Sequence, residues 1–439
     1  MTTTTTRMAA VMALLLSSAA ASAQEAVPAA APAAGGNVIF FHPDGTGVNH
    51  WTAARMAIVG PDGELNWDRL PGIGVYTGHM ADRLTGTSNG GATVHAYGVK
   101  VAANSFGQNG GEPLASPSLA REALDAGKAV ALVQSGAIIE PGTAAFVASV
   151  PERDDYDQIA QQVIESGAQV ILAGGERYML PAGTQGRHGE GAREDGVNLV
   201  ERAKALGYTV VYTREELLAL DPAATPKVLG LFAADHTFND QDWELNNLEG
   251  KPTYVETAPT IGEMADWALR AVESDPEGFF VVIEEEGTDN LANSMNAAGT
   301  LEALARADEA VGVIRGFVDG RDDTLMLVTA DSDAGGLQVL SGAEAPADGF
   351  VAATTDGGGI LLGQEGRRGR VFLAAPDADG VRLPFGIAFV GYNDVAGGIL
   401  VRAAGAGSET LPPLLDNTDI HRLMRERMFG SRPQAAAGQ

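Results

Sequence analysis

The sequence predicts an α/β protein with a doubly wound, mostly parallel central sheet, helices on both faces and a small cap or insertion region. Short apolar runs alternate with amphipathic runs along most of the chain, an order typical of this class. Most of the apolar runs are almost continuous in hydrophobicity, as expected of strands covered on both faces. With 439 residues, of which 45% are hydrophobic, the chain can bury a large core.

Six apolar runs are the predicted strands of this sheet. They cover residues 37–45, 129–136, 168–175, 278–287, 324–333 and 386–394. Between them, apolar residues recur with the period of an amphipathic helix. The predicted helices cover residues 117–127, 156–167, 196–207, 260–275 and 298–320.

The two ends of the chain differ in composition from its body. The first residues place one arginine before an apolar run that ends in ASA, which predicts a secretory signal and a periplasmic or secreted location. The predicted organisation is a signal peptide at 1–23, an Ala/Pro linker at 24–36, one folded domain at 37–430 with insertions near 102–114 and 341–369, and a flexible tail at 431–439.

Acidic residues outnumber basic residues by 57 to 29, which gives a formal net charge of −28. Electrostatic repulsion therefore disfavours nucleic acid and anionic membranes as partners, whereas cations are attracted. For most of these carboxylates the alternative is a solvated surface that keeps the protein soluble. The chain has no cysteine, so disulfides and thiolate zinc ligands are excluded.

Carboxylates recur where the predicted strands end. Asp44 ends the first strand, and Glu284 to Glu286 with Asp289 follow the fourth. Asp331 and Asp333 follow the fifth strand, and Asp394 follows the sixth. Strand ends of a doubly wound sheet converge on one edge, so these groups could meet in one pocket. Any one of them alone is more often a turn former or a helix cap than a ligand.

Eight segments, taken in order, resemble the alkaline phosphatase family from Val38 to about Met424. They read VIFFHPDGTG, TSNGGATVHAYGVK, PGTAAFVASVPER, VILAGGERYMLP, VLGLFAADH, GFFVVIEEEGTDN, LVTADSDAGG and DNTDIHRLM. The resemblance implies an alkaline phosphatase-like catalytic domain, a phosphate ester substrate and a phosphomonoesterase that works through a phosphoseryl intermediate. A homodimer is implied by the resemblance alone.

The resemblance also implies two catalytic residues. Ser88 stands ten residues before Gly98 of YGVK, at the position of the nucleophile. Thr87 is a rival, because it occupies the position of the acidic residue that precedes the nucleophile in the family. Arg153 aligns with the arginine that grips two phosphate oxygens, a task that suits the rigid guanidinium fork. On local sequence alone, TSNGG is an ordinary helix cap and Arg153 an exposed ion pair.

For metals, the resemblance implies that Asp44 bridges two ions and that Glu284 belongs to a magnesium site. Thr143 is the hydroxyl partner of Glu284 only after a one-residue shift, because ungapped register places Gly142 there. The predicted metal ligands are Asp44, Thr143, Glu284, Asp289, Asn293, Asp331, Ser332 and Asp394, with Asp333 as a further candidate whose alternative role is to cap the turn.

Three positions that hold zinc-binding histidines in the family carry Asn293, Ser332 and Asp394 here. Oxygen ligands suit Mg²⁺, Ca²⁺ and Mn²⁺, whereas zinc prefers nitrogen or sulfur. The predicted cofactors are therefore Mg²⁺ or Ca²⁺, with Mn²⁺ as an alternative and zinc disfavoured. Among the histidines, His42, His50 and His95 are expected near the pocket and could contribute to it. Hydrogen bonding or contact with phosphate is the more frequent role for such residues, and metal binding is the alternative.

Two other functions fit the same sequence. On this scaffold the substrate could be a phosphate diester, a phosphate triester or a sulfate ester. The other alternative is a non-catalytic protein that binds an oxyanion or a metal. Retention of Ser88, Arg153, Asp44 and Glu284 together argues against it, because a binding site would not need a nucleophile.

Overall fold

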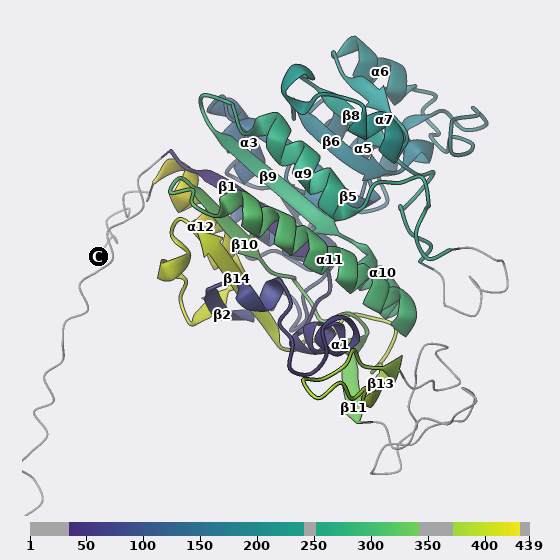
Figure 1. Ribbon diagram of the computed structural model, residues 1–439. Coiled ribbons are helices and arrows are strands. Elements are labelled where there is room, and N and C mark those ends of the chain that lie inside the picture. Colours follow the sequence, from purple (N-terminus) through teal and green to yellow (C-terminus); the bar gives the residue numbers. More distant parts are fainter. Residues whose placement is uncertain (1–34, 241–251, 342–371, 431–439) are drawn as a thin grey trace, which may run out of the picture. The chain divides into compact units, whose positions relative to one another are not determined.

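The computed structural model describes residues 35–240, 252–341 and 372–430 (Figure 1). The predicted signal peptide and tail lie outside these residues, as do nearly all of the linker and of the insertion at 341–369. A ten-stranded sheet dominates the described part, in the order β15-β2-β14-β10-β1-β9-β5-β6-β8-β7. Only β14 runs against its neighbours β10 and β2, so the sheet is mixed but mostly parallel, which confirms the predicted class.

The strands of this sheet are short, and most are fully buried. In sheet order they are β15 (Leu414–Asp416), β2 (Gly72–Thr77), β14 (Ile399–Gly405), β10 (Thr324–Val328), β1 (Asn37–Pro43), β9 (Phe279–Glu285), β5 (Ala129–Ala137), β6 (Val170–Gly174), β8 (Val228–Leu231) and β7 (Thr209–Val211). The central strand β1 is buried at every position. Its side chains alternate between two apolar cores, with Phe40 on one face and Phe41 on the other.

Helices cover both faces of the sheet. α9 and α11 lie side by side across one face (Figure 1) and pack their apolar side chains into the core that contains Phe41. α2, α3, α5, α6 and α12 contribute to the core that contains Phe40. The α-helices are α1 (Val48–Ile58), α2 (Ser88–Tyr97), α3 (Leu119–Asp125), α4 (Pro141–Ala144), α5 (Tyr156–Ile164), α6 (Leu199–Ala205), α7 (Arg214–Leu218), α9 (Ile261–Val272), α10 (Gly287–Asn293), α11 (Ala297–Val318) and α12 (Asn417–Phe429).

All five predicted helices form, and five of the six predicted strands lie in the central sheet. The prediction for 386–394 is wrong in its placement, because this run contributes β13 (Pro384–Ala388) to a separate antiparallel sheet, β11-β13-β12. Its other strands are β11 (Gln338–Ser341) and β12 (Phe372–Leu373). A second small sheet pairs β3 (Gln108–Asn109) with β4 (Glu112–Pro113) inside the predicted insertion at 102–114.

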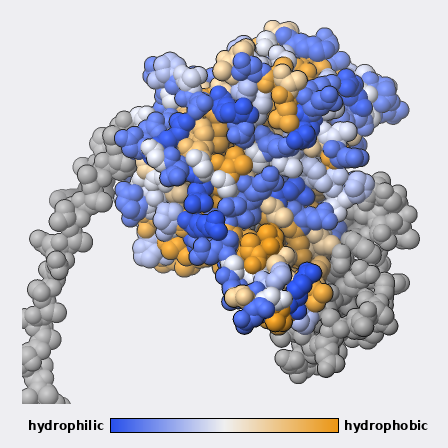
Figure 2. All heavy atoms as spheres, viewed as in Figure 1, coloured by the Kyte–Doolittle hydropathy of each residue, from blue (hydrophilic) through white to orange (hydrophobic). Residues whose placement is uncertain are grey.

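The surface agrees with the acidic composition. On the face shown in Figure 2, hydrophilic residues cover most of the area and hydrophobic residues gather in separate patches. Within the described ranges, no helix combines the length and the apolar character that a membrane crossing requires.

Candidate metal centre

Three parallel strands bring distant carboxylates together at their carboxyl ends. β1 lies between β9 and β10, and the register pairs His42 with Glu284. Asp44 follows β1 directly, and Asp331 lies three residues beyond β10. Asp44, Glu284 and Asp331 are all buried, so the predicted convergence at this sheet edge is confirmed for these three side chains.

Two groups of side chains around Asp44 have the spacing of metal ligands. In one group, donor atoms of His42, Asp44 and Asp331 lie within 4.8 Å of one another. In the other, oxygens of Asp44, Glu284 and Glu286 meet the same limit. The candidate ligand atoms around Asp44 therefore include an imidazole nitrogen as well as carboxylate oxygens.

Many polar atoms at this centre have no hydrogen-bond partner among the described residues. Orphaned buried polar atoms cost free energy unless something satisfies them, and oxygen atoms at this spacing fit a divalent cation. The orphaned atoms are both ring nitrogens of His42, Asp44 Oδ2, both carboxylate oxygens of Glu284 and of Asp331, Glu286 Oε2, Asp289 Oδ1 and Ser332 Oγ. These residues therefore fit a divalent cation, and which ion they bind stays a prediction.

Burial and mutual repulsion shift the pKa values of these groups. Burial raises the pKa of Asp44 to about 8, and Asp331 adds to this rise, while His42 and the Ser88 hydroxyl oppose it. Burial also raises the pKa of Glu284, and Asp44 raises it further. Burial lowers the pKa of His42, but Asp44, Asp331 and Glu284 outweigh it and raise the value to about 9. Without cations, the centre therefore holds protons to limit its negative charge.

A third group of ligand candidates is held together by an amide. The side-chain nitrogen of Asn293 donates to Asp289 Oδ2 and to Asp394 Oδ1, both at 3.0 Å. Asn293 Oδ1 accepts from the backbone N–H of Gly335 at 2.8 Å. As their four-residue spacing predicted, Asp289 and Asn293 meet on one side of α10, and Asp394 joins them from the connection between β13 and β14. Burial raises the pKa of Asp289, and Asp394 is the next cause of that rise.

Ser88 and Thr87 have different surroundings. Ser88 is the first residue of α2, is 8% exposed and lies close enough to interact with the Asp44 carboxylate. The Thr87 hydroxyl donates to Ala103 O at 2.6 Å and accepts from Gly90 N–H, so Thr87 is the N-cap of α2. The Ser88 hydroxyl therefore lies beside Asp44 at the N-terminus of α2, where an anion is favoured, whereas the Thr87 hydroxyl is engaged in capping. Which of the two is the nucleophile stays a prediction.

Two glycines lie so close to carboxylates of the centre that a side chain would not fit in their place. A Cβ on Gly91 of α2 would come within 2.5 Å of Asp331 Cβ, so only glycine lets the helix approach this carboxylate. A Cβ on Gly142 would lie 1.6 Å from Glu284 Oε1, so Gly142 is the α4 residue whose backbone faces Glu284. This contact agrees with the ungapped register between this chain and the family, which places Gly142 and not Thr143 beside Glu284. Thr143 is buried beside Gly142, and its role as a ligand stays a prediction.

Ser332 and Asp333 differ in their surroundings. Ser332 is 1% exposed and follows Asp331 directly. Asp333 belongs to neither ligand group around Asp44. Its Oδ1 lies 3.3 Å from His50 Nδ1, and its backbone pairs with Val395. This backbone pairing holds the segment after β10 next to the segment that carries Asp394.

Arg153 lies at the side of the centre in a half-buried position. Its Nη2 bonds Glu140 Oε2 at 2.9 Å, and 40% of its side chain is exposed. Burial lowers the pKa of Arg153, but Glu140, Glu286 and the other carboxylates of the centre outweigh it and raise the value. Arg153 is therefore a charged donor within electrostatic reach of the centre and open to solvent.

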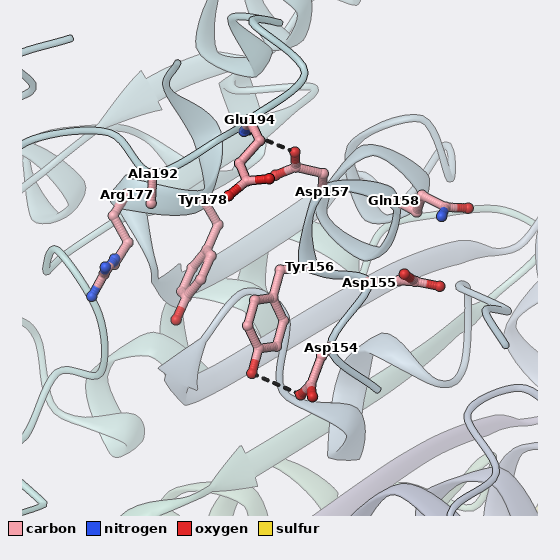
Figure 3. A pocket seen from close by; sticks show the side chains of 9 residues that line it. All are labelled: Asp154, Asp155, Tyr156, Asp157, Gln158, Arg177, Tyr178, Ala192 and Glu194. Carbon is pink, nitrogen blue, oxygen red and sulfur yellow. Dashed lines mark hydrogen bonds between the residues drawn. The ribbon is translucent and has the colours of Figure 1, made fainter. Parts of the chain in front are cut away.

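The five residues that follow Arg153 in the sequence, 154–158, line part of a polar pocket of about 450 Å³ (Figure 3). The rings of Tyr156 and Tyr178 meet in it edge to face, with centroids 5.4 Å apart, and the Tyr156 hydroxyl donates to Asp154. The remaining lining residues are Asp155, Asp157, Gln158, Arg177, Ala192 and Glu194.

The predicted set of site residues omitted two residues of the centre, and the sequence undervalued a third. Glu286 joins Asp44 and Glu284, and the EEE run gave a signal, because alternate residues of a strand end share a face. Glu140 holds Arg153, and its position just before Pro141 at the start of α4 offered only a weak signal. His42 was noted for its nearness to Asp44, but no sequence pattern shows that its ring enters the carboxylate cluster.

Fold and site together define an α/β protein with a candidate divalent-metal centre at the carboxyl edge of its sheet. A family model described as alkaline phosphatase matches residues 36–358. The chain therefore belongs to the alkaline phosphatase family.

Relatives in sequence and structure agree with this assignment. Tissue-nonspecific alkaline phosphatase of Rattus norvegicus is 29% identical over 340 residues, which are 67% of this chain and 62% of that protein. The match thus spans less than two thirds of the rat protein. The alkaline phosphatase of Escherichia fergusonii is 27% identical over 392 residues, 78% of this chain and 82% of that protein. The crystal structure of Thermus thermophilus alkaline phosphatase is 25% identical, covers 91% of this chain and 92% of its own, and superposes with a TM-score of 0.72.

Proposed function

We propose that this chain is an exported, metal-dependent phosphomonoesterase that releases inorganic phosphate through a phosphoseryl intermediate. The observation that carries the proposal is the position of Ser88, at the N-terminus of α2 and beside Asp44, next to a cluster of unpaired buried carboxylates. A binding protein would have no need of a hydroxyl at this place.

Each residue has a defined task in the proposed reaction. The Ser88 oxygen attacks phosphorus, the ester bond to the alcohol breaks, and the alcohol leaves with a proton; water then attacks the phosphoserine and frees phosphate. Asp44 orients the Ser88 hydroxyl, and Arg153 donates to the non-bridging phosphate oxygens. Divalent cations held by the carboxylates would supply charge neutralisation and a lower pKa for the nucleophile. Such chemistry depends mainly on positioning and charge.

The experiment that tests the function removes all metal with a chelator and restores one ion at a time. Mg²⁺, Ca²⁺, Mn²⁺ and Zn²⁺ are each added to the stripped protein, and turnover is measured with a phosphate monoester, a phosphate diester and a sulfate ester. We expect restored turnover that is fastest with the monoester. Failure of every ion to restore turnover would contradict the proposed function, and preference for a diester or a sulfate would replace it.

Arg153→Ala should lower kcat/KM for a monoester by about 100-fold, because it removes a charged donor from the transition state. The matched control is Arg202→Ala, since Arg202 is also half-exposed and forms an ion pair, with Glu165 at 2.9 Å, but on α6. Steady-state kinetics of both variants check this expectation. Equal losses in the two variants would show that Arg153 has no special part in catalysis.

We also propose that the pocket beside Arg153 receives the organic part of the ester. Tyr156→Ala should raise KM for an aryl phosphate about five-fold, because an aromatic contact is worth about 1 kcal/mol. KM for the phosphate ester of a small alcohol should not change, and kcat should stay the same for both substrates. Equal changes in KM for the two esters would contradict this placement. The carboxylates of Asp155, Asp157 and Glu194 in the lining disfavour anionic organic groups.

A further inference from the structure

The His42 side chain is completely buried and has no hydrogen-bond partner for either ring nitrogen among the described residues. It points to the same side of β1 as Phe40, on which its ring stacks at 5.9 Å, and it meets the ring of His95 edge-on at 5.6 Å. These two contacts fix the plane of the imidazole. The ring is thus held in a single orientation by packing.

This orientation aims Nε2 at two carboxylates. Nε2 lies 3.3 Å from Asp44 Oδ1 and 3.8 Å from Asp331 Oδ1. In a tetrahedral site with bonds of about 2.0–2.1 Å to nitrogen and oxygen, neighbouring ligand atoms are separated by about 3.3–3.4 Å. The separation from Nε2 to Asp44 agrees with this value, and the separation to Asp331 is longer. Both carboxylate oxygens of Asp331 also lack a hydrogen-bond partner within the described ranges.

We propose that His42 Nε2 is a direct metal ligand and that it binds, together with Asp44 and Asp331, a divalent cation that accepts nitrogen, of the Zn²⁺ or Co²⁺ class. Glu284 Oε1 lies 3.7 Å from the other ring nitrogen, Nδ1. A carboxylate on that side is the usual partner that fixes the tautomer of a metal-binding histidine. The neighbouring group of Asp44, Glu284 and Glu286 offers oxygen only and suits a hard cation such as Mg²⁺.

This assignment deepens the proposed function at the same centre, and its test measures binding rather than turnover. Metal-free full-length protein receives one equivalent of Cu²⁺ as a paramagnetic probe, and pulsed EPR detects coupling to imidazole nitrogen. Calorimetry then compares Zn²⁺ with Mg²⁺. His42→Gln should abolish the nitrogen coupling and weaken Zn²⁺ binding by roughly 100-fold or more, beyond what loss of a supporting partner usually costs. Mg²⁺ binding should change much less.

The matched control is His236→Gln. His236 also lies near two carboxylates, Asp235 at 4.0 Å and Asp240 at 3.8 Å, but its side chain is 14% exposed. The nitrogen coupling should persist in this variant. Coupling that persists in folded His42→Gln, or that is lost in His236→Gln, would overturn the assignment.

If His42→Gln does not fold, the wild-type protein decides the question together with separate Gln variants of each of the six other histidines. Nitrogen coupling that survives all six substitutions supports His42 as the ligand. Coupling that is absent from the wild type, or that disappears with one of these six residues, refutes it. Because no step measures turnover, an inactive protein that shows His42-dependent coupling would refute the proposed function and leave the ligand assignment intact.

Discussion

Ser88→Ala should abolish the phosphoenzyme and lower turnover of a phosphate monoester by about 1,000-fold or more, because no second nucleophile replaces the missing oxygen. The residual rate would come from the cations and from Arg153. Acid quenching during turnover traps the phosphoserine, and mass spectrometry locates the phosphate. The side chain is small and lies at the start of α2, so the fold should persist.

Thr87→Ala is the matched control for this prediction. Thr87 caps α2 through Gly90 N–H and donates to Ala103 O. The variant should therefore lose about 1 kcal/mol of unfolding free energy but still form the phosphoenzyme. Urea unfolding measures the first effect and acid quenching the second. A phosphoenzyme that is lost in Thr87→Ala and kept in Ser88→Ala would reverse the assignment of the nucleophile.

Local sequence was sufficient for the central strands because they are buried on both faces. β1, β5, β6, β9 and β10 are short runs of almost pure apolar character, and a parallel sheet then forces their carboxyl ends to one edge. The position of Asp44, Glu284 and Asp331 follows from this geometry alone. These three residues can therefore be predicted to lie together although they are far apart in the sequence.

Hydrophobicity could not say which sheet a strand joins. The run at 386–394 is as apolar as a central strand, yet β13 pairs with β11 and β12. The central position beside β10 belongs to β14, which carries Arg402 and runs antiparallel. Asp394 still reaches Asn293, because it lies in the connection that leads from β13 into β14. Asp394 therefore lies beside the other ligand candidates although the strand before it was predicted in the wrong sheet.

The contacts that define the chemistry of the centre are long-range and were the least predictable. The entry of His42 between Asp44 and Asp331 depends on how its ring packs against Phe40 and His95. No pattern in β1 specifies that packing. The sequence prediction named His42 as a possible contributor but based its choice of oxygen ligands on the three substituted histidine positions, and that choice stays a prediction.

Metal-free protein should lose stability steadily as the pH rises from about 4 to about 9. The pKa of Asp44 rises on folding from 3.8 to about 8, and the pKa of Glu284 rises in the same direction. Between the two values the folded state binds more protons than the unfolded state, so stability falls as pH increases. His42 changes stability in the same direction, because folding raises its pKa from 6.5 to about 9. The stability that protonated His42 contributes is therefore lost as the pH rises from 6.5 to about 9. A tenfold difference in proton affinity between the folded and unfolded states corresponds to about 1.4 kcal/mol.

Divalent cations should reverse this loss, because they neutralise the ionised carboxylates and bind only the folded chain. At a free ion concentration of about 100 times Kd, the gain is about 2.7 kcal/mol. Thermal unfolding at several pH values, with chelator and with Mg²⁺ or Zn²⁺, measures both effects. In Asp44→Asn the metal-free protein should be more stable at pH 9 than the wild type and should gain little from cations, since it lacks the carboxylate common to both ligand groups. Metal-free wild-type protein that is equally stable at pH 6 and pH 9 would show that these carboxylates do not repel one another as the geometry requires.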